Sequence, residues 1–138
     1  MAELHPYLNF DGTCREAMTF YQACLGGDLQ LMTFGDNPGG GVPPGAEDRI
    51  MHSTLTSGSL RLLASDGRPG EAPRQGDSVH LSLNLQSREE IDSLFVALGA
   101  GGNVTMPLGD MPWGGRFGML VDRFGMPWMF HFDLTRQS

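Results

Sequence analysis

The chain has 138 residues, of which 40% are hydrophobic and 18% charged, so it suits a single domain with a core, and wholesale disorder is excluded. Its formal net charge is −7 and its nine basic residues are scattered, which disfavours nucleic acid as a partner. It contains no apolar run that could span a bilayer and no signal-peptide pattern, so we expect a soluble, cytoplasmic protein without a membrane partner.

The first half of the chain predicts one strand, one helix and three further strands. The strand covers 6–10, and the helix covers 13–27 with a capping box formed by Thr13 and Glu16. The apolar side chains of this helix recur at helical spacing: Cys14, Ala17, Met18, Tyr21, Cys24 and Leu25. The two cysteines would lie about 15 Å apart, beyond the limit of about 7 Å for a disulfide, so we expect both to be reduced.

A strand over 28–34 and a hairpin complete this half. A loop rich in proline and glycine over 37–47 separates them. The hairpin strands cover 49–56 and 59–65 and flank a two-residue turn, Ser57-Gly58. Asp66 follows the hairpin, where we expect it to turn or cap the chain.

The second half repeats this order after a polar, glycine-rich linker. A strand over 79–85 places leucines on one face and His80, Ser82 and Asn84 on the other. A helix over 88–98 has Ser87 and Glu90 as its capping box, and strands follow over 103–108, 115–122 and 127–133. Three glycines at the beginning of the strand over 115–122, at positions 114, 115 and 118, are typical of close backbone approach.

The repeat predicts two similar modules within one domain that spans 1–138. Leu8-Asn9-Phe10 precedes the first helix as Leu83-Asn84-Leu85 precedes the second. We expect module 1 at about 1–66, a linker at about 67–77 and module 2 at about 78–138. A concave site between two such modules would collect residues from both.

Two stretches, FYQACLGG (Phe20–Gly27) and VHLSLNLQSREEIDSLFVALGAGG (Val79–Gly102), resemble the vicinal-oxygen-chelate superfamily of glyoxalases, bleomycin-resistance proteins and dioxygenases. Two more, MHSTLTSGSLRLLASD and PWGGRFGMLVDRFGMPWMF, are similar to its PhnB-like branch. The resemblance implies an α+β fold, in which two βαβββ modules with mixed sheets curl into cups, and a homodimer. The methyltransferase label of that branch carries little weight, because the chain has no glycine-rich nucleotide turn.

The resemblance also implies metal-ligand positions on the first and last strands of each module. These correspond to Pro6, about Leu62, His80 and Met129, of which only His80 can bind a hard divalent ion. One ligand cannot hold such an ion, so we expect no metal cofactor. In an alternative with shifted strand register, His5, His80 and His131 would bind a divalent ion such as Zn, Ni, Mn or Fe.

Six residues are candidates for binding a small-molecule ligand. His80 occupies the polar strand face, and Met129 and His131 share one face of the last strand. Trp113 stands in a loop between prolines and glycines, where it can form a pocket wall. Arg116 can bind an anionic group, although a surface ion pair is commoner, and His52 either lines the cleft or satisfies a backbone group.

Three functions remain open from the sequence. The first is a small-molecule-binding protein of the glyoxalase/bleomycin-resistance type that lacks most of the usual metal ligands. The second is a metal-dependent lyase, isomerase or dioxygenase that uses the three histidines. The third is a non-catalytic structural or interaction module. In this module the cup is filled by the protein's own methionine and aromatic side chains. The sequence identifies no catalytic residue. Both cysteines belong to the apolar stripe of a helix, and no serine is paired with a histidine in a recognisable order.

Overall fold

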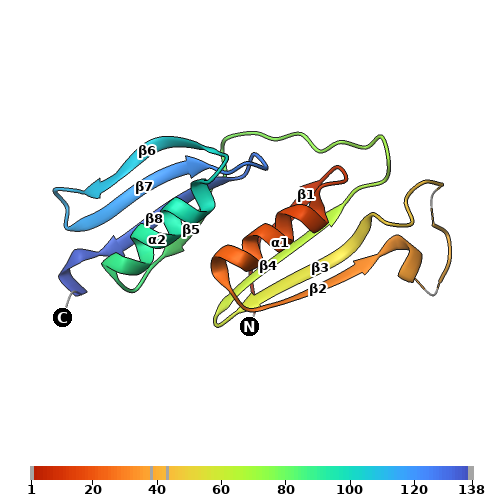
Figure 1. Cartoon of the computed structure of the whole chain (residues 1–138), viewed down its shortest axis with the longest axis horizontal. Coiled ribbons are helices and arrows are strands. Elements are labelled where there is room, and N and C mark those ends of the chain that lie inside the picture. The colour runs from red at the N-terminus through yellow and green to blue at the C-terminus, as the bar shows by residue number, and fades with distance from the viewer. Residues whose placement is uncertain (1, 38, 43, 137–138) are drawn as a thin grey trace. The chain divides into compact units, whose positions relative to one another are not determined.

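The structure, a computed structural model, describes residues 2–37, 39–42 and 44–136. It divides into two compact units, Met1–Arg74 and Gln75–Ser138. Each unit has a four-stranded mixed sheet and one α-helix, in the order strand, helix, strand, strand, strand (Figure 1). The predicted α+β fold with two βαβββ modules is confirmed.

The first unit forms one sheet in the order β1-β4-β3-β2. Strand β1 is parallel to β4, and the other pairs are antiparallel. The elements are β1 (Tyr7–Phe10), α1 (Cys14–Leu25), β2 (Asp28–Thr33), the short 3-10 helix η1 (Phe34–Asp36), β3 (Ile50–Ser57) and β4 (Leu60–Asp66). The described positions of the predicted loop 37–47 form turns and irregular backbone, while positions 38 and 43 lie outside the described residues.

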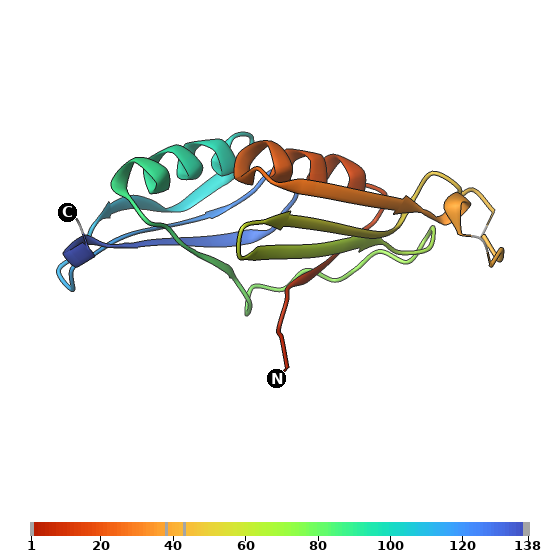
Figure 2. The ribbon, with the colours of Figure 1, turned by 90° about the horizontal axis from the view of Figure 1, so that it is seen from below.

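Helix α1 covers one face of this sheet (Figure 2). Its apolar side packs on Leu8, Phe10, Leu55 and Leu62, and the helical residues of this core are Cys14, Ala17, Met18 and Tyr21. Because strand residues alternate between faces, the neighbours of these buried residues lie on the other side of the sheet. We call that side the first open face; it carries Tyr7, Asn9, His52, Thr54 and Leu63.

The start of α1 differs from the prediction. The Thr13 side chain caps nothing, so the capping box with Glu16 does not form. Instead, the Asp66 carboxylate accepts hydrogen bonds from the backbone N–H groups of Gly12 (2.8 Å) and Cys14 (3.0 Å). A carboxylate from the end of β4 therefore supplies the cap, and the predicted capping role of Asp66 is confirmed.

The hairpin of the first unit turns one residue later than predicted. Its turn residues are Gly58 and Ser59, and Gly58 has a φ of +60° that suits glycine. Neither Cys14 nor Cys24 forms a disulfide bond, as expected. Burial raises the pKa of the Cys14 thiol to about 11, despite a contact with the Ser53 hydroxyl that works in the opposite direction.

The second unit forms a sheet in the order β5-β8-β7-β6, with β5 parallel to β8. The elements are β5 (Leu81–Asn84), α2 (Arg88–Gly99), β6 (Asn103–Asp110), β7 (Gly115–Val121), β8 (Pro127–Asp133) and the 3-10 helix η2 (Leu134–Arg136). Strand β5 begins two residues later than predicted, so His80 lies just before the strand and is half-buried, while Val79 is exposed. The predicted strand position of His80 is therefore wrong.

Helix α2 covers one face of the second sheet (Figure 2). Phe95 packs on Gly118 of β7, where an added Cβ would lie 2.8 Å from the phenylalanine ring, so the predicted close approach at this glycine is confirmed. The other core residues are Leu85, Ile91, Leu98, Leu120, Met126, Trp128, Phe130 and Phe132. The opposite side, which we call the second open face, carries Ser82, Asn84, Phe117, Met119, Met129 and His131.

At the start of α2, one of the two hydrogen bonds of the predicted capping box forms. The Ser87 hydroxyl accepts a hydrogen bond from the Glu90 backbone N–H (3.1 Å). The Glu90 carboxylate accepts from the backbone N–H of Gln86 (2.8 Å), one residue before the predicted Ser87.

None of the helices in the described ranges is long and apolar enough to cross a membrane.

Candidate functional site

The second open face gathers three of the six residues that the sequence singles out for ligand binding. In β8, Trp128, Phe130 and Phe132 are buried beneath α2, so Met129 and His131 lie on the opposite face. The predicted sharing of one strand face by these two residues is confirmed. His131 pairs with Asn84 of β5 on one side and with Phe117 of β7 on the other.

Trp113 joins this face from the turn between β6 and β7. The turn is closed by a hydrogen bond from the Met111 N–H to the Gly115 carbonyl (2.7 Å). Gly114 has a φ of +96°, a conformation that L side chains rarely adopt. The turn folds the Trp113 indole back toward Phe117, and the two rings meet edge to face with their centroids 6.1 Å apart. The indole is still 64% exposed.

Gly115 allows the Trp113 and His131 rings to approach the same point. A Cβ atom added to Gly115 would lie 2.7 Å from Trp113 Nε1 and 2.7 Å from His131 Nε2. Both contacts are shorter than a real Cβ tolerates, so the two ring nitrogens occupy space that a side chain would need. The sequence predicted close approach of a neighbouring backbone at Gly115; the nearest atoms are instead those of these two side chains, so two hydrogen-bonding atoms come together there.

Whether these two ring nitrogens can bind a ligand depends on the partners that they already have. Among the described residues, neither the Trp113 indole nor the His131 imidazole makes a hydrogen bond. Every buried side-chain nitrogen or oxygen in the same ranges has a partner, so the unpartnered His131 nitrogens are not buried. An indole N–H only donates, whereas an imidazole nitrogen donates or accepts. The pair can therefore contact a polar atom that comes from outside the protein.

His52 lies on the first open face, within a chain of polar side chains. Its Nδ1 is 3.3 Å from the Tyr7 hydroxyl, and its Nε2 is 3.3 Å from the Thr54 hydroxyl. A neutral imidazole has one donor and one acceptor nitrogen, so both nitrogens are satisfied by these hydroxyl groups. The sequence offered a backbone group as a partner for His52, whereas the contacts in the structure are to side-chain hydroxyls.

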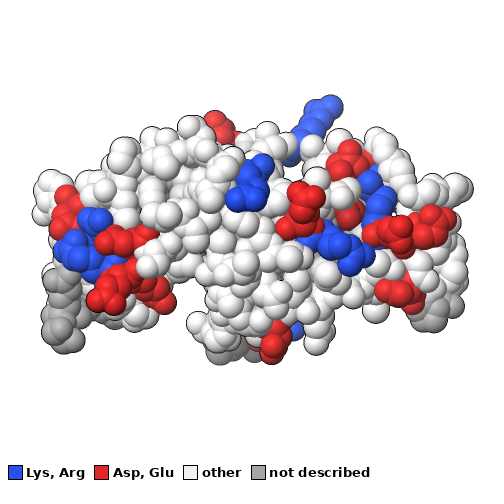
Figure 3. All heavy atoms as spheres, in the orientation of Figure 1, with Lys and Arg blue, Asp and Glu red and all other residues white. Residues whose placement is uncertain are grey.

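Arg116 lies on the α2 side of β7, away from Trp113 and His131. Its guanidinium donates to Asp92 of α2 (2.8 Å) and to Asp110 of β6 (2.9 Å). Arg88 also donates to Asp110, and hydrogen bonds from Arg88 and Arg116 lower the pKa of the Asp110 carboxyl. Figure 3 shows acidic and basic side chains in mixed clusters on one face of the protein. The ion pair that the sequence analysis weighed for Arg116 is thus present.

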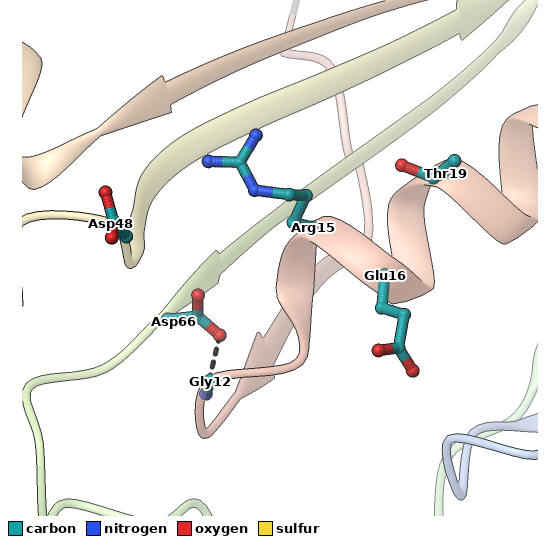
Figure 4. A pocket seen from close by; sticks show the side chains of 6 residues that line it. All are labelled: Gly12, Arg15, Glu16, Thr19, Asp48 and Asp66. Atoms are coloured by element: carbon teal, nitrogen blue, oxygen red, sulfur yellow. Dashed lines mark hydrogen bonds between the residues drawn. The ribbon is translucent and has the colours of Figure 1, made fainter.

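A pocket of about 400 Å³ lies in the first unit, at the start of α1 (Figure 4). It is lined by Gly12, Arg15, Glu16, Thr19, Asp48 and Asp66. The Asp66 carboxylate already accepts three backbone N–H groups, while Arg15, Glu16 and Asp48 are exposed to water. The lining includes no aromatic or large aliphatic side chain, of the kind that small-molecule sites usually have, and none of the predicted site residues.

The residues on the open faces do not fit a divalent metal ion. Leu62, which the resemblance places at one ligand position, is buried beneath α1, and Pro6 precedes β1. His5 contacts Glu3 in the first unit, whereas His80 and His131 belong to the second. In residues 2–37, 39–42 and 44–136, no group of three His, Cys, Asp or Glu side chains is placed to hold a metal. We therefore assign no step to a metal.

Sequence reasoning missed Tyr7 and Phe117 as members of the two open faces. Tyr7 belongs to a short strand, and its contact with His52 spans 45 residues of sequence, so no local pattern could reveal it. The sequence shows Phe117 only as one of several aromatic residues in the last third of the chain. Strand alternation from Gly115 would have placed it on the same face as Met119, and only the pairing of β7 with β8 brings it beside His131.

A model of the Glyoxalase/Bleomycin resistance protein/Dioxygenase superfamily matches residues 3–130 of the chain. The chain belongs to this superfamily. Protein YjdN from Escherichia coli is 32% identical over 93% of both chains. The structure of protein PA1353 from Pseudomonas aeruginosa has a TM-score of 0.87 at 42% identity and covers 96% of this chain and 98% of its own.

The predicted resemblance to the PhnB-like branch is also confirmed. A PhnB protein from Bacillus cereus, named as a candidate 3-demethylubiquinone-9 3-methyltransferase, has a TM-score of 0.78 at 26% identity. The match covers 95% of this chain and 99% of the Bacillus protein. Membership of the glyoxalase superfamily therefore extends over both units of the chain.

Proposed function

We propose that the chain is a small-molecule-binding protein of the glyoxalase/bleomycin-resistance type, and that its ligand lies on the second open face against Trp113, Phe117, Met129 and His131. The observation that carries this proposal is the exposed Trp113 indole beside a His131 imidazole that has no hydrogen-bond partner in the described part of the chain. An exposed indole offers a large apolar surface at a small cost in side-chain entropy. The histidine adds a polar group that can fix the orientation of a ligand.

Support also comes from the contrast between the two open faces. On the first, the His52 nitrogens are satisfied by Tyr7 and Thr54. On the second, Phe117, Met119 and Met129 are half-buried apolar side chains, and they surround a histidine with free nitrogens. A surface that combines apolar walls with a few unsatisfied polar groups is typical of a ligand site.

Tryptophan fluorescence tests this proposal. A set of aromatic and dicarbonyl compounds is screened for a rise in the melting temperature, and each stabilising compound is titrated while the emission is recorded. At 100 times its Kd a ligand adds about 2.7 kcal/mol to stability. We expect stabilising compounds to quench the exposed Trp113, whereas Trp128 is only 2% exposed and serves as the internal reference. Trp113→Phe should remove the quenching and weaken binding about tenfold.

Two results of the screen would count against the proposed function. If no compound stabilises the protein, small-molecule binding itself loses its support. If compounds stabilise the protein but bind Trp113→Phe as tightly as the parent chain, the ligand lies elsewhere. In that case the pocket at the start of α1 becomes the next site to examine.

We also propose that two copies of the chain form a homodimer. The outer strands β2 and β6 each leave one edge of backbone N–H and C=O groups unpaired within their own sheets. Both edge strands carry exposed apolar side chains, Met32 (43%) and Val104 (47%). Sedimentation velocity at micromolar concentration should give twice the chain mass of 15.0 kDa, and a monomer would contradict the proposal.

We propose the cytoplasm as the location of the protein. Its two cysteines form no disulfide bond, which supports a reducing compartment.

A further inference from the structure

We infer that the ligand of the second open face is an uncharged, planar aromatic compound that carries a carbonyl oxygen, and that this oxygen accepts hydrogen bonds from Trp113 and His131. The inference rests on the proposed function and narrows it to a class of ligand. It depends on three features of the site: the position of the two ring nitrogens, the apolar surfaces around them and the charges nearby.

The ring nitrogens determine the polar atom of the ligand. Trp113 Nε1 carries a hydrogen and can only donate, so its partner must be an acceptor. His131 Nε2 lies equally close to the Cβ position of Gly115, and it donates when the imidazole proton is on that nitrogen. An oxygen atom with two lone pairs that faces both nitrogens satisfies both donors at once. A carbonyl group provides such an oxygen.

The surrounding rings determine the shape of the ligand. The Trp113 indole meets Phe117 edge to face, at an interplanar angle of 68°, so one indole face is left uncovered. Aromatic rings pair best in offset-stacked or edge-to-face arrangements, and a planar ligand can stack on the uncovered face. Met129 and Met119, which pair across β7 and β8, extend the apolar surface along the sheet.

The charges near the site disfavour an anionic ligand. Asp133 pairs with Gly115 in the β7–β8 ladder and lies on the same strand face as His131. The basic side chain nearest in sequence, Arg116, points to the other side of the sheet and is paired with Asp92 and Asp110. The chain as a whole has a net charge of −7. A neutral carbonyl oxygen avoids the repulsion that a carboxylate would meet here.

Proton–nitrogen NMR with three matched probes tests the inference. Acetophenone has the ring and the carbonyl, ethylbenzene has the same shape without an acceptor, and benzoate has the ring with a charged acceptor. The chain has two indole N–H signals, and Trp113→Phe identifies which one belongs to Trp113. The Trp128 indole, which donates to Asp122 at 2.8 Å, should not move.

We expect acetophenone to move the Trp113 signal downfield and to bind at least threefold more tightly than ethylbenzene or benzoate. His131→Phe should weaken acetophenone binding about fivefold and reduce its preference over ethylbenzene, because only the Trp113 donor remains. His131→Gln, which keeps an N–H donor, should restore part of that preference. Gly115→Ala should weaken acetophenone binding further, because its methyl group displaces both rings.

The outcomes separate the inference from the proposed function. Equal binding of acetophenone and ethylbenzene would overturn recognition of the oxygen, and tighter binding of benzoate would overturn the uncharged class. If acetophenone leaves the Trp113 signal in place while compounds from the fluorescence screen move it, the inference fails and the proposed function stands. If no compound from either experiment perturbs Trp113, both fail.

Discussion

Replacing Asp66 with alanine should lower the free energy of unfolding by about 4 kcal/mol. The Asp66 side chain is 4% exposed and accepts three backbone hydrogen bonds, two at the start of α1 and one from Ile50 at the start of β3 (2.9 Å). Removal of the carboxylate leaves three N–H groups without an acceptor, and those of Cys14 and Ile50 are buried. Urea denaturation followed by circular dichroism measures the loss.

The matched control is Asp48→Ala, which removes the same charge from an exposed position close by. It should change the free energy of unfolding by less than about 0.5 kcal/mol. Asp66→Asn keeps one acceptor oxygen and should give an intermediate loss. A loss in Asp66→Ala no larger than in Asp48→Ala would mean that this carboxylate does not hold α1 and β3 together.

The second large effect is expected in the second unit, at Asp122. Its side chain is 3% exposed and accepts hydrogen bonds from the backbone N–H groups of Phe124 (2.8 Å) and Met126 (3.0 Å) and from the Trp128 indole (2.8 Å). It thereby closes the turn between β7 and β8, the two strands of the proposed site. Asp122→Ala should lower the free energy of unfolding by about 3 kcal/mol.

A double-mutant cycle isolates the part of this effect that comes from the indole. Trp128→Phe removes the indole donor and part of the buried ring volume, and the cycle cancels the volume loss because it occurs with and without the Asp122 carboxylate. The pair Asp122→Ala and Trp128→Phe should show a coupling energy of about 1 to 2 kcal/mol in urea denaturation. Asp77→Ala, an exposed aspartate in the same unit, is the charge control. Additive losses from the two substitutions would show that the indole contact contributes nothing to the turn.

The architecture of the chain could be predicted from its sequence because both halves carry strong periodic signals. The apolar stripe that begins at Cys14 gave α1, and the alternation before Asn84 gave β5, each within two residues of the observed bounds. Local capping rules were less successful. Thr13 has the residue type of an N-cap, but Asp66, 52 residues beyond Cys14, supplies the acceptors through tertiary contact.

The candidate site could be predicted only in part, for a similar reason. Strand alternation places Met129 and His131 on one face, and a tryptophan between proline and glycine indicates an exposed wall. The sequence could not show that the turn after Asp110 folds Trp113 back onto Gly115. It also could not assign Arg116 to the opposite face, because that depends on the contact with Asp92 of α2.

The central claim is that the second open face binds the ligand. A crystal structure of the chain grown with acetophenone tests it most directly. We predict electron density for the probe against Trp113 and Phe117, with its oxygen within hydrogen-bonding distance of Trp113 Nε1 and His131 Nε2. Density for the probe in the pocket formed by Arg15, Glu16 and Asp48, with none on the second open face, would contradict the claim.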